Sequence, residues 1–377
     1  MGRAGGFGIE EEYLLVDLAD GHVLARPSQA VMRRCREVVG EYFAEEMFNS
    51  QIEVASPVFG NLHEARGFFS EIRHGLCREL AAEGAGLYCA ASHPGARWRS
   101  QCPRNLEHYR QVFDDYQAVA RRSLLCGLHV HVGVAQGRDR MQLINQVLGW
   151  LPLLLILSTS SPFWSGEATG YRSYRRVVCG EWPHMGMPEP LRDWRDYQRY
   201  WALLQGTGGL ANDGDFWWTI RPSRRFPTVE LRICDACPRL EDGLAIAGLF
   251  RHLLEHALRE WRNGQPLSQE QRWIAQENYW RAYRHGRDGT FIGAHDQHPV
   301  TASSWLAQLR ALKPPDTEDA GQAFDQAARI LREGTSAERQ LLTFERALAH
   351  GQDARHALRA VVRQVLGEVS PGAGPSS

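Results

Sequence analysis

Lysine is almost absent from this 377-residue chain: Lys313 is the only one, so nearly all of the 43 basic residues are arginine. A Walker-type phosphate-binding loop requires a Gly-Lys-Ser/Thr run, and Schiff-base catalysis requires a lysine amine. Lys313 is followed by two prolines and suits neither role. Any phosphate group that the protein binds must therefore be held by arginine side chains, backbone amides or a metal ion.

Net charge is also nearly absent, at -1 for the whole chain. The chain therefore has no excess of positive charge that would attract nucleic acid or an anionic membrane. We therefore expect a small-molecule partner, no nucleic acid and no membrane. The longest apolar stretch, residues 141–158, is interrupted by Gln142, Asn145 and Pro152, which favours a buried core helix over a membrane span.

A dense cysteine framework is the third feature that the sequence lacks. The eight cysteines are scattered through apolar segments, unlike those of a small disulfide-rich secreted domain. We expect free thiols in a cytoplasmic protein. Cys234 and Cys237 have the Cys-x-x-Cys spacing of a redox or zinc motif, but no second such pair accompanies them, so this role stays an alternative.

Five short segments alternate apolar residues with polar or ionisable ones, as a half-buried β-strand does. We expect strands at residues 8–14, 51–54, 128–132, 215–221 and 228–233. Their polar positions are Glu10 and Glu12, Gln51 and Glu53, His129 and His131, Asp215, Thr219 and Arg221, and Glu230 and Arg232. Such strands predict a sheet with one face packed on helices and the other face polar.

The polar face can be a solvated surface or a binding site. A solvated face would mix Lys, Thr, Ser and Gln, whereas Glu, His and Arg dominate here. Crowded carboxylates repel one another unless a cation lies among them, and carboxylates with an occasional imidazole suit Mg²⁺ or Mn²⁺. Zinc held by His129 and His131 is the competing prediction. Arg221 and Arg232 are expected to stabilise a transferring phosphoryl group.

Five motifs follow one another along the chain. They are Gly-Ile-Glu-Glu-Glu at 8–12, Gln-Ile-Glu-Val at 51–54, Gly-Leu-His-Val-His-Val-Gly at 127–133, Ser-Pro-Phe-Trp at 161–164 with Thr-Gly-Tyr-Arg at 169–172, and Arg-Pro at 221–222 with Thr-Val-Glu-Leu-Arg at 228–232. Together they resemble the motifs of the type 2 glutamate–cysteine ligase family, most closely its bacterial carboxylate–amine ligase branch. The resemblance runs from Gly8 to Gly286.

The resemblance implies an α+β, glutamine-synthetase-like fold in which a curved antiparallel sheet forms a funnel backed by helices. Its polar face would bind ATP with Mg²⁺ or Mn²⁺. The implied metal ligands are Glu10, Glu12, Glu46, Glu53, His129 and Glu230. Glu46 and Glu53 have opposite strand parity, so a turn must lie between them.

Arginines beside such carboxylates are typical clamps for phosphate or for a substrate carboxylate. We therefore expect Arg221 and Arg232 to be catalytic, and Arg172, Arg175 and Thr228 to bind ATP or substrate. Glu11 is expected to point to the helical side of the sheet. His131 stays open between a core histidine and a ligand.

From about residue 240 onward the pattern becomes almost wholly helical, with helical spacing of apolar residues at 240–262, 268–283, 322–333 and 337–365. We expect residues 1–290 to form the catalytic core, residues 291–369 a helical C-terminal part of the same domain, and residues 370–377 a disordered tail. The C-terminal helices either close the pocket or form the subunit contact of a homodimer.

The function that the resemblance implies is ATP-dependent carboxylate–amine ligation. The enzyme phosphorylates a carboxylate and lets an amine displace the phosphate, and γ-glutamyl-cysteine formation is one choice of substrates. Three alternatives stay open: a metal-dependent carboxylate or guanido kinase without amide formation, a zinc-dependent hydrolase, and a non-catalytic binding protein that retains the fold.

Overall fold

The computed structural model describes residues 5–208, 216–260, 267–293, 298–312 and 317–369. Asp215, Lys313 and the expected tail at 370–377 lie outside these described residues. The division into a core at 1–290 and a helical part at 291–369 stays a prediction.

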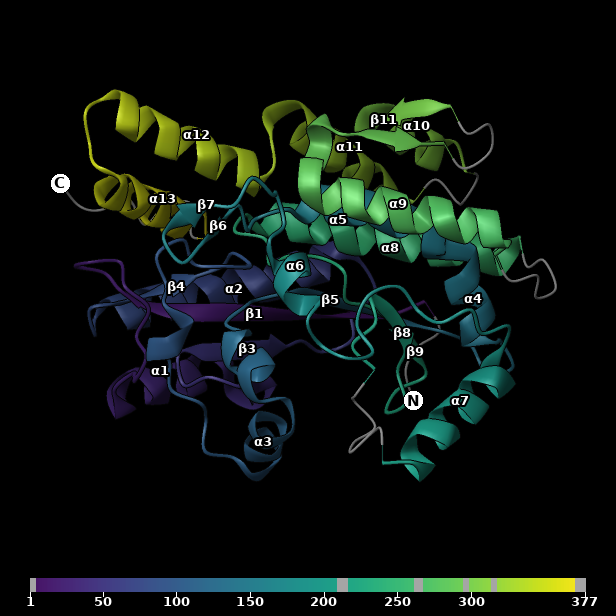
Figure 1. The fold of residues 1–377 in the computed structure, drawn as a ribbon, viewed down its shortest axis with the longest axis horizontal. Coiled ribbons are helices and arrows are strands. Elements are labelled where there is room, and N and C mark those ends of the chain that lie inside the picture. Colours follow the sequence, from purple (N-terminus) through teal and green to yellow (C-terminus); the bar gives the residue numbers. More distant parts are fainter. Residues whose placement is uncertain (1–4, 209–215, 261–266, 294–297, 313–316, 370–377) are drawn as a thin grey trace.

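An antiparallel sheet forms the centre of the molecule (Figure 1). In spatial order its strands are β2 (Phe43–Glu45), β3 (Gln51–Ala55), β1 (Phe7–Asp17), β5 (Leu128–Gly133), β9 (Thr228–Leu231) and β8 (Ile220–Pro222), and β4 (Ala85–Tyr88) pairs with the C-terminal end of β1. The sheet is open rather than closed into a barrel, with β2 at one edge and β8 at the other. The predicted α+β class with an antiparallel sheet is confirmed.

One face of this sheet packs on helices, as the alternation of apolar residues predicts. Arg73 of α2 (Leu62–Ala81) binds Glu11 of β1, and Gly243 of α8 (Leu240–Arg259) lies against Leu128 of β5. Glu11 therefore points to the helical side, which confirms its exclusion from the polar face. The opposite face carries Glu10, Glu12 and the other ionisable positions.

The remaining helices lie around this core. They are α1 (Gln29–Val39), α3 (Glu107–Arg122), α4 (Arg140–Val147), α5 (Leu151–Ser158), α6 (Arg175–Cys179), α7 (Trp194–Gly206), α9 (Gln269–His285), α10 (Ala302–Ala311), α11 (Glu318–Glu333), α12 (Ser336–Ala349) and α13 (Ala354–Val369). Figure 1 shows α5, α8 and α9 side by side above β1, with α12 and α13 at one end of the molecule.

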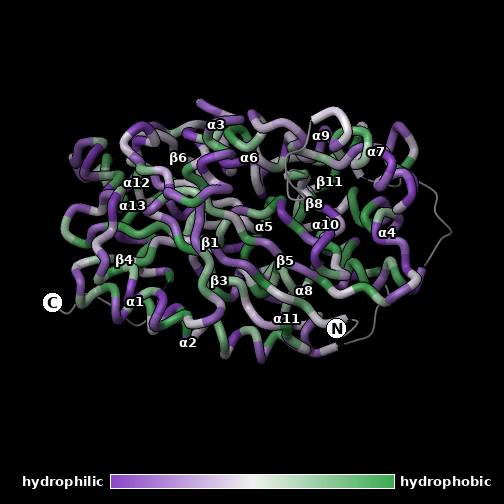
Figure 2. Tube along the Cα trace, turned by 90° about the horizontal axis from the view of Figure 1, so that it is seen from below, coloured by the Kyte–Doolittle hydropathy of each residue, from purple (hydrophilic) through white to green (hydrophobic). Residues whose placement is uncertain are grey.

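The predicted core helix at 141–158 is confirmed. The stretch Arg140–Ser158 is the one helical segment among the described residues that is long and apolar enough to cross a membrane, and most of it is buried inside the protein. Every residue of α5 is buried, and α5 appears as a hydrophobic segment near the middle of the molecule in Figure 2.

Two sequence predictions of element length were wrong. Only β8 forms within the described part of the strand expected at 215–221, because Trp218 and Thr219 instead pair with the loop at Gly186. The helical stretch expected at 337–365 is two helices, since Gly351 takes a left-handed φ of 80° in the turn between α12 and α13.

Short hairpins also interrupt the helices. The region after residue 240 contains β10 (Thr290–Ile292) and β11 (Pro299–Thr301), and an earlier hairpin consists of β6 (Phe163–Trp164) and β7 (Glu167–Ala168). The C-terminal region is therefore less uniformly helical than its apolar spacing suggested.

All eight cysteines are free thiols, as predicted. Cys234 and Cys237 are buried, and their thiols lie against the carbonyl oxygens of Leu154 and Asp235, at 3.7 and 3.6 Å. The Cys-x-x-Cys spacing therefore forms no disulfide in this structure.

Buried His93, which follows β4, makes stability depend on pH. Its Nε2 donates to the Gly21 carbonyl at 2.8 Å, and its Nδ1 accepts from the Gly95 amide at 3.2 Å. Burial lowers the pKa of His93 to about 4; the nearby His22 acts in the same direction and the bond to Gly21 opposes both. Tyr88 is the other titratable group that packs on the ring.

We expect His93 to cost stability in mild acid. Below about pH 6.5 the His93 ring takes up a proton in the unfolded chain but not in the folded protein. The free energy of unfolding is therefore unaffected by His93 above that pH and falls as the pH is lowered towards 4. The loss at pH 5 is about 2 kcal/mol. Urea unfolding at pH 7 and pH 5 measures it: His93→Gln should reduce the drop by that amount, and the control His63→Gln, at an exposed position, should not. Equal drops in wild type and His93→Gln would contradict this account.

Candidate active site

The strand register brings the polar positions together on one face. Cα partners are Glu12 with Glu53, Glu10 with His129, His131 with Glu230, and Arg221 with Glu230. Because alternate residues of paired strands share a face, β3, β1, β5, β9 and β8 all contribute to one surface. The polar surface predicted from the sequence is thus one continuous site.

Three carboxylates, from Glu12, Glu46 and Glu53, form what we call the acidic triad. One oxygen from each lies within 4.8 Å of the others. Glu46 follows β2, and the turn into β3 brings it beside Glu53, as the opposite parity required. Burial, reinforced by the charge of Glu46, raises the pKa of Glu12 to about 8 and holds that of Glu53 well above its usual value.

No arginine among the described residues forms an ion pair with the acidic triad; its nearest basic atom is Nε2 of His129, 3.7 Å from Oε1 of Glu12. Three carboxylates at this separation, half-buried or buried, cannot all stay charged without a cation between them. The triad is therefore suited to a hard divalent cation.

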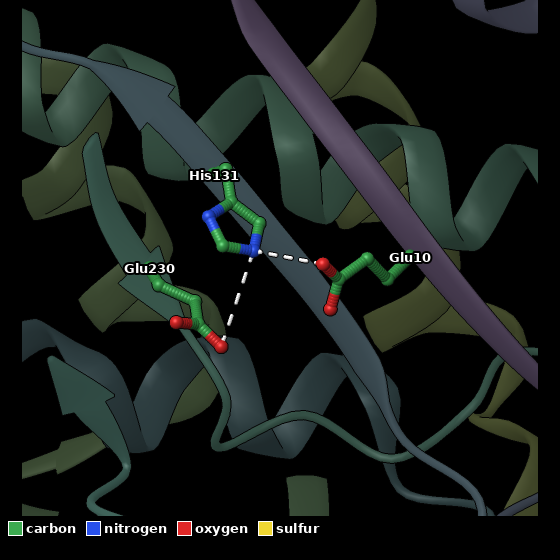
Figure 3. A group of neighbouring side chains, drawn as sticks. All are labelled: Glu10, His131 and Glu230. Carbon is green, nitrogen blue, oxygen red and sulfur yellow. Dashed lines mark hydrogen bonds and ion pairs between the residues drawn. The ribbon is translucent and has the colours of Figure 1, made fainter. Parts of the chain in front are cut away.

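Glu10, His131 and Glu230 form a second cluster, which Figure 3 shows converging from three strands. Nε2 of His131 lies 3.1 Å from Oε1 of Glu10 and 3.9 Å from Oε1 of Glu230, while Nδ1 lies 3.2 Å from the Thr228 hydroxyl. Burial opposes ionisation of Glu10, but hydrogen bonds with His129 and His131 hold its pKa well below the usual value. His131, left open by the sequence, belongs to this site.

His129 lies between the two clusters. Its Nδ1 is 3.1 Å from Oε2 of Glu10, and its buried Nε2 has no hydrogen-bond partner. Burial, with the nearby Arg232, lowers the pKa of His129 to about 4, so the ring is neutral. When Nδ1–H donates to Glu10, Nε2 keeps an unengaged lone pair, which is the arrangement of a metal-binding histidine.

Glu230 orients two arginines beside these clusters. Arg221 binds it through Nε–Oε2 at 2.7 Å and Nη2–Oε1 at 3.1 Å, and Arg232 also donates to Oε1. Burial works against the charge of Glu230, but Arg232 and Arg221 lower its pKa to about 2. Both guanidinium groups are thereby fixed at the polar face, where a phosphate would need them.

Arg175 reaches the acidic triad from the other side. A Cβ atom at Gly127 would collide with Nη2 of Arg175 and lie 3.1 Å from Nε2 of His129, so a larger residue there would displace the Arg175 guanidinium. The Gly127 amide donates to Oε2 of Glu12 at 2.6 Å. Gly127 is therefore a site residue that sequence reasoning noted only as part of a motif.

Asp235 was missed altogether. It is fully buried and accepts from the Ser160 amide at 3.0 Å and from the Ser161 and Ser173 hydroxyls at 2.8 Å each. The Ser161 hydroxyl in turn accepts from the Arg175 amide at 3.1 Å. The sequence feature that marks Asp235 is a single acidic residue within an apolar segment. It lies between the two cysteines of the Cys-x-x-Cys motif, whose spacing suggests a role for the thiols rather than for the acid.

Arg172 is not brought to the acidic clusters. Its Nε donates to Oε1 of Glu338 at 3.1 Å, and Glu338 also accepts the Thr335 amide at the start of α12. Its expected role in binding ATP or substrate stays a prediction. The structure thus gathers Glu10, Glu12, Glu46, Glu53, His129, Glu230, Arg221, Arg232, Arg175 and Thr228 at one face and leaves Arg172 at the start of α12.

Carboxylates, a neutral imidazole and guanidinium groups on one face suit phosphoryl transfer from a nucleotide triphosphate. The acids can hold divalent cations, and the arginines can stabilise charge on a moving phosphoryl group.

Comparison with known proteins agrees with this chemistry. The family model for glutamate–cysteine ligase family 2 matches residues 6–364. A protein of Pseudomonas entomophila with the provisional name glutamate–cysteine ligase 2 is 66% identical over 374 residues, covering 99% of this chain and 98% of its own length. A Pseudomonas putida protein with the same provisional name is 64% identical over 94% of this chain and 97% of its own length.

Two crystal structures share the fold at low identity. A glutamate–cysteine ligase from Francisella tularensis in complex with AMP has a TM-score of 0.69 at 13% identity and covers 100% of this chain and 91% of its own. A bifunctional glutathione synthetase from Pasteurella multocida also has a TM-score of 0.69, at 16% identity, covering 97% of this chain and 52% of its own.

Proposed function

The chain belongs to glutamate–cysteine ligase family 2 and is an ATP-dependent carboxylate–amine ligase, and we propose that the polar face of its sheet performs the reaction through an acyl phosphate. The acidic triad, with its unneutralised carboxylates, is the observation that carries this proposal. The names of the relatives support glutamate and cysteine as the carboxylate and the amine. The eight free thiols support a cytoplasmic location.

The residues at this face fit Mg²⁺ or Mn²⁺. The three carboxylates of the acidic triad would hold one ion, with the unpartnered Nε2 of His129 3.7 Å from Glu12. Glu10, His131 and Glu230 border a second position. Hard oxygen ligands dominate both groups, which favours these ions over zinc. When bound, such ions neutralise charge on the β- and γ-phosphates of ATP.

The protein's own groups orient and stabilise the reacting atoms. Arg221 and Arg232, fixed by Glu230, are placed to stabilise charge on the transferring phosphoryl group. Arg175 supplies a third guanidinium beside Glu12. Asp235 positions the start of α6, where Arg175 lies, because it binds the Ser161 hydroxyl that accepts from the Arg175 amide.

The reaction then needs no protein nucleophile. An oxygen of the substrate carboxylate attacks the γ-phosphorus of ATP, the bond to the β-phosphate oxygen breaks, and ADP leaves. The nitrogen of the neutral amine attacks the acyl carbon, the bond from that carbon to the bridging phosphate oxygen breaks, and inorganic phosphate leaves. The nitrogen gives up one proton, which the departing phosphate can take, and the amide is formed. Water must be kept out because it would hydrolyse the acyl phosphate.

Hydroxylamine as a surrogate amine tests the proposed function. Purified protein with Mg-ATP and glutamate should release ADP and form a hydroxamate in equal amounts, and cysteine in place of hydroxylamine should yield a dipeptide mass. ADP without hydroxamate would instead identify a kinase. Failure of both products across a panel of amino-acid carboxylates would contradict the proposal.

ATP affinity should depend on divalent metal. Without it, the ionised Glu10 faces the triphosphate directly and repels it, and no cation joins the acidic triad to the phosphates. Calorimetric titration with ATP should show affinity at least roughly tenfold weaker in EDTA than in excess Mg²⁺. Equal affinities in the two buffers would contradict a metal-bridged nucleotide.

A further inference from the structure

A cavity lies beyond the C-terminal end of β1, away from the acidic clusters. It has a volume of about 670 Å³ and lies between the turn at Gly21, the loop after β4, the tip of the β6–β7 hairpin and helix α13. Leu14 and Val16 continue the polar-face row of β1 past Glu12 but are apolar and buried. Five residues of strand, about 16 Å, separate Glu12 from the end of β1.

Three arginines line this cavity. Arg97, Arg355 and Arg359 form no ion pair and no side-chain hydrogen bond within the described part of the chain, and Nε of Arg359 is buried without a hydrogen-bond partner. Most arginines in this protein bind a carboxylate or a carbonyl oxygen. Unpaired guanidinium groups from two separate segments, facing one cavity, indicate a site for a negatively charged ligand.

The other charges at the cavity do not cancel these three. Asp20 is the one carboxylate among its described lining residues, and it lies 4.0 Å from Nε2 of His22. His93 is engaged on both ring nitrogens by Gly21 and Gly95. The first turn of α13, at Ala354 and Arg355, adds the positive end of a helix dipole.

The cavity also has an apolar wall. Leu358 and Val362 of α13 are buried and face it on the same side of the helix as Arg355 and Arg359. Helix α13 packs closely against the turn at Gly21, because a Cβ atom at Gly21 would lie 3.3 Å from Cγ1 of Val362. A ligand that suits this lining has an apolar body and an anionic end.

We propose that this cavity binds a small amphipathic dianion, carrying either a phosphate monoester or two carboxylates on an apolar body. Arg355 and Arg359, one helical turn apart, hold the anionic group together with Arg97 from the opposite loop, and Leu358 and Val362 cover the apolar body. The bound ligand bridges the turn after β1, the loop after β4 and α13, so its binding stabilises the folded protein.

Phenyl phosphate and phthalate are suitable probes because they place the two kinds of dianion on the same aromatic ring. Calorimetry and thermal melting are run on the full chain in EDTA, at ionic strength held constant with chloride, so that the metal-dependent nucleotide site is not engaged. We expect saturable binding of one anion per chain and a rise in melting temperature. The probe that binds more tightly identifies the kind of dianion.

Variants locate the binding. Arg355→Gln combined with Arg359→Gln should weaken affinity at least roughly tenfold, and Arg97→Gln alone should weaken it by a smaller factor. Arg363→Gln, an exposed position one turn further along α13 and outside the cavity, is the matched control and should bind as the wild type does. Unchanged affinity in both the double variant and Arg97→Gln, or no saturable binding of either probe, would overturn the proposal.

Discussion

Replacing Glu53 by glutamine should lower the rate of amide formation by roughly 10² to 10³ while the protein stays folded. Glu53 lies on the polar face of β3, opposite Glu12, and shares the acidic triad with Glu46. Glutamine keeps the shape of the side chain but removes a carboxylate that, under the proposed function, would hold a divalent cation. Without metal, the melting temperature should stay the same or rise slightly, because burial and the charge of Glu46 already disfavour the charged form of Glu53 and glutamine is always neutral.

Glu230→Gln should lose activity to a similar degree but should also lose stability. The sequence alone predicts the same stability for both variants, since both positions lie on polar strand faces. The structure separates them: Glu230 is only 2% exposed and neutralises both Arg221 and Arg232. Its removal takes away the carboxylate that both of these largely buried guanidinium groups bind, which costs about 3 kcal/mol.

ADP release with saturating Mg-ATP, together with thermal melting in EDTA, measures both effects. Glu45→Gln is the control. Glu45 is the last residue of β2 and directly precedes Glu46, but its carboxylate pairs with Arg36 and Arg104 outside the triad, so turnover should be unchanged. Near-wild-type turnover of Glu53→Gln would remove that residue from the site. A Glu230→Gln variant that melts at or above the wild-type temperature would contradict the ion-pair account.

Strand parity carried most of what could be predicted about the site. Alternation along single strands was enough to place Glu10 and Glu12 on one face and Glu11 on the other. Once the family resemblance implied Glu46 as a ligand, parity also required the turn between Glu46 and Glu53. These are local consequences of a two-residue period, and no knowledge of the partner strands is needed to draw them.

Partnerships between distant segments could not be read in the same way. His131 joins Glu10 and Glu230 only because β5 pairs with both β1 and β9 in one register. Asp235 is held by three donors from 62 to 75 residues earlier in the chain. Arg172 pairs with Glu338, 166 residues later, in a helix for which the family motifs gave no partner. Such contacts depend on the tertiary fold, which single-strand periodicity does not specify.

The buried pair of Arg73 and Glu11 should be the most costly ion pair to break. Nε and Nη2 of Arg73 bind the two Glu11 oxygens at 3.0 and 2.7 Å, and Arg73 also donates to the carbonyls of Cys237 and Pro238 at 3.0 and 2.6 Å. The two side chains are 2% and 4% exposed. This one guanidinium thus joins β1, α2 and the segment that leads into α8.

Arg73→Met should therefore lower the free energy of unfolding by about 3 to 5 kcal/mol, because it leaves a buried carboxylate with only the Tyr13 hydroxyl as partner. Urea unfolding measures this loss. Arg66→Met in the same helix is the matched control, since Arg66 makes an equally bidentate but exposed pair with Glu241 and should cost less than about 1 kcal/mol. Glu11→Leu combined with Arg73→Met should recover part of the loss, because no charge is then left buried, although the two carbonyls stay unpaired. Equal losses for Arg73→Met and Arg66→Met would show that burial of the pair contributes nothing to stability, whereas the structure predicts a difference of at least about 2 kcal/mol.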